Sequence, residues 1–496
     1  MSTTTLIAKP TTPLPKLWPL ALAVATLLVI LLAPPVAGLP IAGQRMLAVF
    51  GFAVVVWVTE ALDYAVSAVV IASLMALLLG ISPDPAKPAA LMGTTQGLTM
   101  AVSGFGNTAL ILVAAALFLA AAMSVTGLDR RIALFILSHV GTRTSRVVIG
   151  GIVITIVLSF LVPSATARAA VVVPIMLGIV LAFGAEKHSR LAALVMLTTV
   201  QAVSVWNVGV KTAAAQNMVA IGFIQRMLGH DITWVDWLVA AAPFSVVLSV
   251  ILYFVAMIML PPESSEVPGG QAAIQRELAE IGPMTGKQKR LLTVSLLLLC
   301  FWATEQILHQ FDSSTTTTAA VAILMLPGIG VMTWNEAQSR IPWGTVVLFG
   351  IGISLGTALL QTKAAAWLAN LIVSGFGLDQ LGALAILAVL AMFLIVIHLG
   401  FASATALASS LIPIIISVLQ KVHTPGINVI GMTMILQFVV SYGFILPVNS
   451  PQGMVAYGTD TFTARDYIRV GLVLTVLAYV LTLVFGATYW RWLGYT

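Results

Sequence analysis

The most regular feature of the chain is a succession of long apolar runs separated by short polar segments. Runs such as Leu17–Ala33, Leu110–Met123 and Val470–Phe485 contain no charged residue. An α-helix needs about 20 mostly apolar residues to cross the hydrocarbon core of a bilayer, whereas the strands of a membrane β-barrel alternate apolar and polar residues. The pattern therefore predicts an all-α polytopic membrane protein with about 11 transmembrane helices, the first of them a retained span.

Four short motifs occur twice, in the same order. The pairs are SATARAAVVVPI (Ser164–Ile175) with SATALASSLIPI (Ser403–Ile414), WVTEAL (Trp57–Leu62) with WATEQI (Trp302–Ile307), AQNMVA (Ala215–Ala220) with PQGMVA (Pro451–Ala456), and ITWVDW (Ile232–Trp237) with FTARDY (Phe462–Tyr467). Ordered self-similarity of this kind indicates an internal duplication. We therefore divide the chain into 1–44 with the first transmembrane helix, a first repeat at 45–260, a polar cytoplasmic linker at 261–290, and a second repeat at 291–496.

Each half shows the same order of apolar segments. Three spans come first, and a short amphipathic helix follows the third directly. Two shorter segments then meet at a Ser-Ala-Thr tip, which predicts a re-entrant helical hairpin. A span that is broken near Lys211 in one half and near Asn449 in the other follows, and a last full span closes each half. Segments that are shortened or broken at matching places in two halves point to the binding site of a transporter, because broken backbone at membrane depth must line a cavity or be buried in protein.

The distribution of basic residues predicts an orientation. If the hairpins do not cross the membrane, most of the 23 lysines and arginines, including Lys9 and Lys16, lie on the side of the N-terminus. Six fall on the opposite side, namely Arg45, Lys87, Arg226, Lys363, Lys421 and Arg491. The positive-inside rule then places the N-terminus in the cytoplasm and the protein in the inner (plasma) membrane. An odd number of spans makes the two halves enter from opposite sides, which predicts an inverted repeat.

Composition narrows the classes of function. Only 8% of the residues are charged, 60% are hydrophobic and the net charge is +6, and we expect no nucleic-acid partner. A single cysteine, Cys300, rules out an internal disulfide, and the six histidines lack the spacing of metal ligands. No paired carboxylates or Ser/His/Asp set share one depth, so we expect neither an enzyme nor a cofactor.

The two Ser-Ala-Thr tips predict an anion site. Each tip offers hydroxyls and backbone N–H groups, and the helix that starts there points its positive dipole end at the tip. Two tips that converge near the middle of the membrane could hold the two ends of a dianion. The alternative is that small residues at the tips let helices pack closely, but Pro174 and Pro413 at the same offset favour a binding site.

Ionisable residues at membrane depth are the second sign of a site, because they are costly there and by default mark function. Arg168 follows the first tip, Lys211 lies in the first broken span, and His398 precedes the second tip. The alternatives are that Arg168 reaches an interface, that Lys211 pairs with backbone carbonyls, and that His398 is a hydrogen-bonded packing residue. We interpret the repeated Glu60 and Glu305 as helix caps or inter-helix locks.

The motifs together resemble those of the divalent anion/sodium symporter family, within the wider ion-transporter superfamily. The resemblance rests on WVTEAL, on TGLDRRIAL (Thr126–Leu134), on the two tips and on LPVNSPQGMVAYG (Leu446–Gly458). It implies a homodimer, with a scaffold domain and a transport domain that moves like an elevator, and substrates that are mostly di- and tricarboxylates or sulfate.

The same resemblance implies which residues touch the substrate. The usual hairpin signature of the family is Ser-Asn-Thr, which contacts substrate and shapes the sodium sites. The residues expected at the site are Ser164, Ala165, Thr166, Arg168, Lys211, Ser403, Ala404, Thr405, Asn449 and Ser450. Ala165 and Ala404 replace both signature asparagines, and with them go two amide oxygens that a sodium ion would use.

These residues predict a secondary transporter of organic dianions in the lipid bilayer. Because the asparagines are absent and Lys211 offers a fixed ammonium near the first tip, we expect transport without sodium, by exchange or with protons. The alternatives are sodium-coupled symport of a dicarboxylate or sulfate and, from another class, an anion channel.

Overall fold

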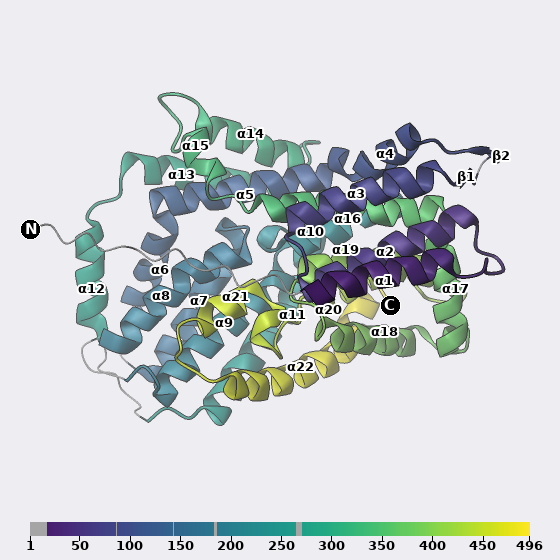
Figure 1. Ribbon diagram of the computed structural model, residues 1–496. Helices are drawn as coiled ribbons and strands as arrows, with labels where there is room; N and C mark the ends of the chain where they lie inside the picture. Colours follow the sequence, from purple (N-terminus) through teal and green to yellow (C-terminus); the bar gives the residue numbers. More distant parts are fainter. Residues whose placement is uncertain (1–16, 86, 142, 183–185, 264–269) are drawn as a thin grey trace, which may run out of the picture.

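The computed structural model describes residues 17–85, 87–141, 143–182, 186–263 and 270–496 (Figure 1). Lys9 and Lys16, which bear on the expected orientation, lie outside these ranges, as do residues 264–269 of the expected linker. The described part is almost entirely helical, with one short antiparallel hairpin of β1 (Pro83–Asp84) and β2 (Lys87–Leu91). The prediction of an all-α membrane protein is confirmed.

The elements follow the same order in both halves. After α1 (Leu17–Leu32), the first half contains α2 (Ile41–Thr59), α3 (Tyr64–Gly80), α4 (Thr94–Val102), η1 (Ser103–Gly106), α5 (Thr108–Thr126), α6 (Leu128–Ser138), α7 (Thr144–Leu161), α8 (Ala165–Ala182), α9 (Arg190–Gly209), η2 (Lys211–Ala213), α10 (Ala215–Leu228) and α11 (Trp234–Met259). The helix α12 (Gly270–Ile281) connects the halves. The second half contains α13 (Gly286–Thr304), α14 (Ser313–Met325), α15 (Trp334–Gln338), α16 (Trp343–Gln361), α17 (Ala364–Phe376), η3 (Leu378–Gln380), α18 (Ala383–His398), α19 (Ala404–Lys421), α20 (Val429–Val440), η4 (Pro447–Asn449), α21 (Pro451–Tyr457), α22 (Ala464–Ala487) and α23 (Tyr489–Trp492).

The repeated motifs are repeated local structures. Thr233 and Asp236 form a capping box at the start of α11, and Thr463 and Asp466 form the same box at the start of α22. Each box satisfies backbone N–H groups that the first helical turn leaves free. The echo of ITWVDW in FTARDY is therefore the start signal of the last helix in each half.

Among the described residues, eight helices are long and apolar enough to cross a membrane: α2, α5, α7, α9, α11, α16, α19 and the helical stretch Ala464–Trp492. Two of them, α7 and α19, are hairpin arms, which the sequence pattern assigned to re-entrant segments. Four of the expected spans, those of α1, α3, α13 and α14, do not meet the criterion, and α1 and α3 fall short of 18 residues. The helix α13 begins with Lys287, Lys289 and Arg290, and α14 has only 13 residues. Length and hydropathy therefore cannot separate a span from a hairpin arm here.

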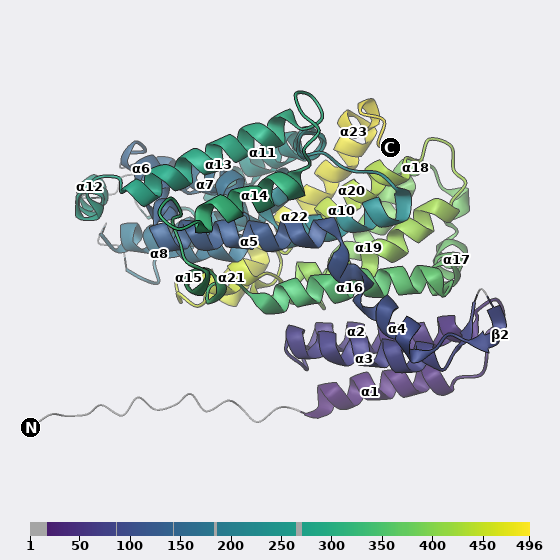
Figure 2. The same cartoon turned by 90° about the horizontal axis from the view of Figure 1, so that it is seen from above.

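The two halves interlock. The helix α3 packs on α16, and its counterpart α14 packs on α5. Likewise the hairpin arm α8 packs against α21, and its counterpart α19 packs against α10. A reciprocal pattern of contacts is what a pseudo-twofold relation between two repeats produces. In Figure 2, α1 to α4 form a layer on one side, and α16 lies between this layer and the other helices.

A glycine allows the closest approach between this layer and α16. A Cβ atom on Gly104 would lie 2.1 Å from the carbonyl oxygen of Gly350. The backbone N–H of Gly104 donates instead to Ser354 Oγ at 2.9 Å. Only glycine fits at this crossing, which fixes η1 against α16.

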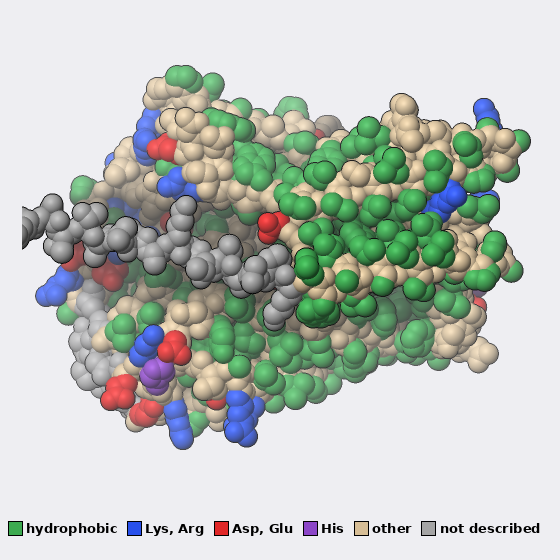
Figure 3. Space-filling view, in the orientation of Figure 1, with side chains coloured by type: hydrophobic (Ala, Val, Ile, Leu, Met, Phe, Trp, Pro, Cys, Tyr) green, Lys and Arg blue, Asp and Glu red, His purple; other side chains and the backbone are tan. Residues whose placement is uncertain are grey.

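The linker helix α12 is held by α6. Arg130 and Glu277 form an ion pair at 3.2 Å, and α12 packs on α6 and α8. Arg131 donates to the carbonyl oxygens of Ile281 and Gly282 at 3.3 and 2.9 Å. On the face shown in Figure 3, charged side chains gather at the end of the molecule that carries α12, while hydrophobic side chains cover most of the rest. The linker therefore docks on the first hairpin at a polar end of the molecule.

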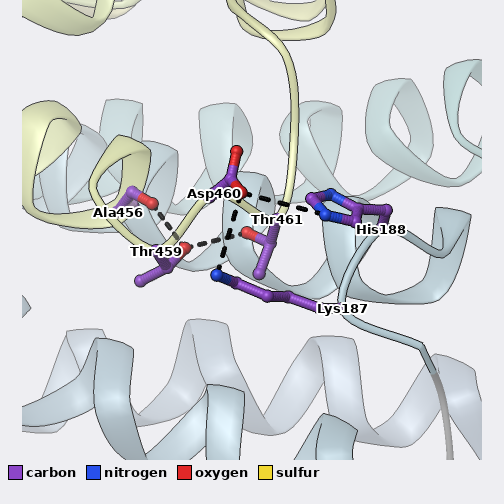
Figure 4. A network of polar contacts seen from close by, with 6 residues as sticks. All are labelled: Lys187, His188, Ala456, Thr459, Asp460 and Thr461. Atoms are coloured by element: carbon purple, nitrogen blue, oxygen red, sulfur yellow. Dashed lines mark hydrogen bonds and ion pairs between the residues drawn. The ribbon is translucent and has the colours of Figure 1, made fainter.

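A loop of the first half contacts a loop of the second half through exposed side chains. Lys187 Nζ and His188 Nε2 each lie 3.8 Å from Asp460 Oδ2, in the network of Figure 4. Thr459, on the same loop as Asp460, donates to the carbonyl oxygen of Ala456 at 2.6 Å. All three charged side chains are exposed, and such pairs contribute little, about 0–1 kcal/mol.

Candidate functional site

The two hairpin tips meet at one cavity of about 390 Å³. Eight of the ten expected site residues line it, namely Ser164, Ala165, Thr166, Ser403, Ala404, Thr405, Asn449 and Ser450. The first tip connects α7 to α8 and the second connects α18 to α19. Arg168 and Lys211 are not among the lining residues.

Four helices start at this cavity. Lining residues Ser164, Ala214, Ser403 and Ser450 each directly precede a helix: α8, α10, α19 and α21. The Oγ atoms of Ser403 and Ser450 cap their helices, accepting from the N–H groups of Ala406 and Gly453 at 3.3 and 3.2 Å. Each helix N-terminus carries a partial positive charge and free N–H donors. Four of them around one cavity favour an anion inside it.

The broken segments also carry amide side chains to the cavity. Gln216 Nε2 donates to Ser441 Oγ at 3.4 Å, and Gln452 Nε2 donates to Ser204 Oγ at 2.9 Å. Each contact joins one half to the other, and both glutamines line the cavity. The sequence analysis did not select them, although they stand at the same place in AQNMVA and PQGMVA. That match was the signal that could have found them.

Asn449 fixes the second tip to the second broken segment. Its Nδ2 donates to the carbonyl oxygens of His398 and Phe401, both at 2.9 Å. These carbonyls lie between the end of α18 and the start of α19. Asn449 therefore positions the tip as well as lining the cavity.

Arg168 lies directly behind the first tip and is fully buried. One guanidinium nitrogen, Nη2, donates to Asn207 Oδ1 and to the carbonyl oxygen of Ala213, the latter at 3.3 Å. Within the described chain, Nε and Nη1 have no hydrogen-bond partner. Full burial rules out the alternative that Arg168 reaches an interface. It touches the cavity through Asn207, which is a lining residue.

Lys211 does not lie beside the expected substrate position. Its side chain, 5% exposed, lines a second cavity of about 250 Å³. Its Nζ donates to the carbonyl oxygen of Ile232 at 2.6 Å and to Ser313 Oγ at 3.5 Å. The turn η2 causes this, because it directs Lys211 to one side of the broken segment while Asn207 and Ala214 face the other. The contact with a backbone carbonyl matches the alternative given for Lys211.

His398 is buried at the end of α18, five residues before Ser403, the first residue of the second tip. Among the described residues neither ring nitrogen has a hydrogen-bond partner, so the reading of His398 as a hydrogen-bonded packing residue does not fit. Its backbone carbonyl oxygen accepts from Asn449 Nδ2 and from the N–H of Phe401.

The rim of the cavity carries Glu60 and Tyr64. Glu60 is the one charged side chain among the described residues that line the cavity. It ends α2 in the left-handed conformation, with φ 49°, and Tyr64 Oη donates to its Oε1 at 3.5 Å. Glu60 is therefore a helix C-cap, as expected, and it also faces the cavity, which was not expected.

No group of three or more His, Cys, Asp or Glu side chains that could hold a metal ion occurs in the described ranges. Each tip offers the hydroxyl groups of one serine and one threonine. The alanines between them, Ala165 and Ala404, lack the amide oxygen that an asparagine would add.

Comparison with known proteins decides the family. A model of the sodium:sulfate symporter transmembrane region matches residues 14–496. The chain belongs to this family of transporters. It is therefore a membrane transporter rather than an enzyme, and the resemblance noted in the sequence is confirmed.

Three relatives show the range within the family. The chain is 56% identical over 487 residues to a membrane protein of Cupriavidus necator, covering 97% of this chain and 94% of that one. It is 25% identical to the sodium-dependent dicarboxylate transporter SdcS of Staphylococcus saprophyticus, over 86% of this chain and 82% of the relative. It is also 25% identical to the L-tartrate/succinate antiporter of Escherichia coli K12, over 96% and 98%.

A solved structure supports the fold alone. The crystal structure of the YdaH transporter of Alcanivorax borkumensis matches with a TM-score of 0.57 at 15% identity, covering 85% of this chain and 97% of that one. Two relatives with different named couplings are equally similar to this chain, so overall identity does not assign the coupling.

Proposed function

We propose that the protein exchanges organic dianions of the di- or tricarboxylate class across the membrane, without sodium. The observation that carries this is that the N-termini of α8, α10 and α19 meet at one cavity, together with both tips. Ser164 and Thr166 of one tip and Ser403 and Thr405 of the other line this cavity, and we propose that their hydroxyls bind the two ends of a substrate. Named substrates of two relatives, dicarboxylate and L-tartrate with succinate, belong to the same chemical class.

Arg168 supports the sodium-independent part of the proposal. In transporters with broken helices, the carbonyls of the unwound backbone are the groups that coordinate a coupling cation. Here the guanidinium of Arg168 already binds the carbonyl oxygen of Ala213 and the side-chain oxygen of Asn207 in the first broken segment. A cation that is part of the chain offsets substrate charge permanently. The sequence analysis gave this role to Lys211, and the contacts favour Arg168 instead.

A fixed cation also favours exchange over symport. A free sodium ion leaves with the substrate, so the empty site becomes neutral before it returns. Arg168 stays, and without an anion its charge is buried with no carboxylate partner within the described residues, which is costly. The carrier then returns readily only when a second anion occupies the cavity. Sodium-coupled symport is the second candidate, because the family is described as sodium:sulfate symporters.

The test is uptake of radiolabelled succinate, L-tartrate, citrate or sulfate into proteoliposomes, with choline replacing sodium. We expect uptake of at least one organic anion that persists in choline and rises when the vesicles are preloaded with the same anion. Uptake that disappears without sodium would overturn sodium independence. Uptake without stimulation by internal substrate would favour the anion channel.

We further propose the arrangement in the membrane that the sequence predicted. The N-terminus lies in the cytoplasm, the segments 45–260 and 291–496 form inverted repeats, and two copies form a homodimer in which a transport domain moves like an elevator. Each chain contains both tips and both broken segments, so each copy has a complete site. Mixed dimers of active and inactive copies should then keep about half of the activity, and complete loss in such mixtures would overturn independent sites.

A further inference from the structure

The repeated Trp-x-Thr-Glu motif ends in two glutamates with opposite surroundings. Glu60 is exposed at the rim of the main cavity, where Tyr64 is its side-chain partner. Glu305 is 8% exposed and lies in the second cavity together with Lys211. The tryptophans of the two motifs behave alike, since Trp57 donates to Ser67 Oγ and Trp302 donates to Thr317 Oγ1, both at 3.2 Å. The difference between the glutamates therefore does not come from the motif itself.

Glu305 and Lys211 meet through Ser313. Ser313 Oγ donates to Glu305 Oε2 at 2.6 Å, its backbone N–H donates to Oε1 at 3.2 Å, and Lys211 Nζ donates to Ser313 Oγ at 3.5 Å. The backbone N–H of Trp234 also reaches Glu305 Oε2 at 3.5 Å. The charged groups that act on Lys211 are Glu305 first, then Asp231, Asp236 and Asp312. Lys211 and Trp234 belong to the first half, and Glu305 and Ser313 to the second.

This network closes one side of the broken segment. Asn207 and Ala214 face the main cavity, and Lys211, between them in sequence, faces the second cavity. Lys211, Ser313 and Glu305 connect the two halves across the second cavity. The stacked rings of Trp234 and Trp302, whose centroids lie 6.1 Å apart, add a second contact between the halves. In a carrier whose tips and broken segments move relative to other helices, the bond from Lys211 to Ser313 must break before the site can open toward that side.

Within the described ranges, the second half has no equivalent network. By the register of AQNMVA with PQGMVA, Pro447 stands where the first half has Lys211. Proline has no side-chain donor. A closed state in which Glu60 took the place of Glu305 would therefore have no ammonium group at the position that corresponds to Lys211. For a duplicated chain we take the opposite-facing state to exchange the roles of the two halves, with Glu60 in the place of Glu305. The two closed states are therefore unequal.

We propose that Lys211, Ser313 and Glu305 form a lock between the halves that makes the empty carrier rest with its main cavity open toward Glu60 and its Lys211 side closed. The proposal rests on the alternating access of the proposed function and adds the sidedness of its resting state. Lys211 acts through Ser313 and Glu305 and does not touch the substrate, so it is a positioning residue.

The test measures which side is open, without substrate. Cys300 is exposed and is first replaced, Cys300→Ala, so that single cysteines can be introduced. Val448→Cys reports on the main cavity, where Val448 is exposed, and Ile221→Cys reports on the second cavity, where Ile221 is buried. Rates of maleimide labelling are measured on purified protein, with Lys211 intact and with Lys211→Met.

We expect Val448→Cys to react quickly and Ile221→Cys slowly while the lock is intact. The ratio to follow is the labelling rate of Ile221→Cys divided by that of Val448→Cys. Lys211→Met should raise this ratio roughly tenfold, which is the change expected from the loss of one hydrogen bond to a charged group. Lys211→Arg should restore most of the original ratio, and Ser313→Ala should shift it in the same direction as Lys211→Met. Glu336→Gln, an exposed carboxylate in the capping box of α15, should leave it unchanged.

The outcomes separate the lock from the proposed function. An unchanged ratio in Lys211→Met and Ser313→Ala overturns the lock, even if the protein exchanges dianions. A shifted ratio together with sodium-dependent uptake supports the lock and overturns the proposed exchange. If Lys211→Met does not give a monodisperse protein, Ser313→Ala, which keeps every charge, decides the question alone.

Discussion

The two hairpin tips present the same Ser-Ala-Thr residues to one cavity, but they are joined to their broken segments in opposite ways. In the first half the hairpin supplies the donor, because Arg168 of α8 binds the carbonyl oxygen of Ala213. In the second half the broken segment supplies the donor, because Asn449 binds carbonyl oxygens of the hairpin. By the repeat register, Ala213 and Asn449 are equivalent positions, and Leu407 stands where the first half has Arg168.

This comparison separates two tasks that share one place. Both halves need a polar bond that holds the tip against the broken segment. Only the first half performs this with a charged group, so only the first half adds a full positive charge to the site. The neutral bond of Asn449 shows that the charge of Arg168 is not required to hold a tip in place. The charge of Arg168 is therefore what distinguishes the first half at this joint, and the variants below test whether transport depends on it.

The largest effect should come from making the first half like the second at this position. Arg168→Leu removes the buried charge and also leaves Asn207 Oδ1 and the carbonyl oxygen of Ala213 without their donor, which costs about 1–3 kcal/mol. We expect uptake reduced to near background, with a melting temperature lowered no more than in Asn449→Ala. The exposed Arg465→Gln is the matched control, and uptake in Arg168→Leu close to that of the control would contradict the role of the charge.

The next effect concerns what the tips share. Thr166→Val and Thr405→Val each remove one hydroxyl from the cavity lining, and a hydrogen bond to a charged group contributes about 1.5–3 kcal/mol. We expect KM for the transported anion to rise about tenfold or more in each variant, with the same melting temperature as the unaltered protein. An effect in one tip only would mean that the substrate is not held between both.

Loss of the neutral bond should act on stability rather than on charge. Asn449→Ala leaves buried carbonyl oxygens of the second tip without their donor, which costs about 1–3 kcal/mol. We expect a lower melting temperature of the purified protein and a partial loss of uptake. Asn428→Ala, which removes a helix cap at the other end of α20, controls for a general loss of stability. Unchanged melting in Asn449→Ala would show that the second tip is held by other contacts.

The smallest effect is expected at the exposed contact between the halves. Asp460→Asn abolishes the ion pairs with Lys187 and His188, which are worth about 0–1 kcal/mol. Melting temperature and uptake should stay within experimental error of the unaltered protein at physiological salt. A marked loss of uptake would indicate that these loops, and not only the tips, differ in function between the halves.

Sequence reasoning found the parts of the site that are written locally. The tips and the broken segments each depend on a few neighbouring residues, and their repetition made them visible, whereas the capping boxes behind ITWVDW and FTARDY were found only in the structure. The direction of Lys211 depends on the turn η2, which no local pattern specified, and the partners of Arg168 lie far along the chain at Asn207 and Ala213. Glu60 was recognised as a cap, but its exposure to the cavity follows from the packing of α2 and α3 beside the tips.

The number of spans was also only partly written in the sequence. A window of hydropathy measures length and apolar content, and α7 and α19 pass this measure although they are arms of hairpins. What distinguishes them is the position of the tip between two arms, which is a matter of three-dimensional folding rather than of composition.

The reciprocal packing of the halves has a consequence for the time course of synthesis. The helix α10 packs on α19, and α8 packs on α21. At roughly 5–20 residues per second, roughly 10 to 40 s pass between translation of α10 and completion of α19. During this interval the first half is in the membrane without α19 and α21, the second-half helices that pack on α10 and α8. Nascent chains should therefore be most sensitive to membrane proteases and most dependent on insertion chaperones before the second hairpin emerges, and a chain truncated after α11 should be degraded rather than accumulate.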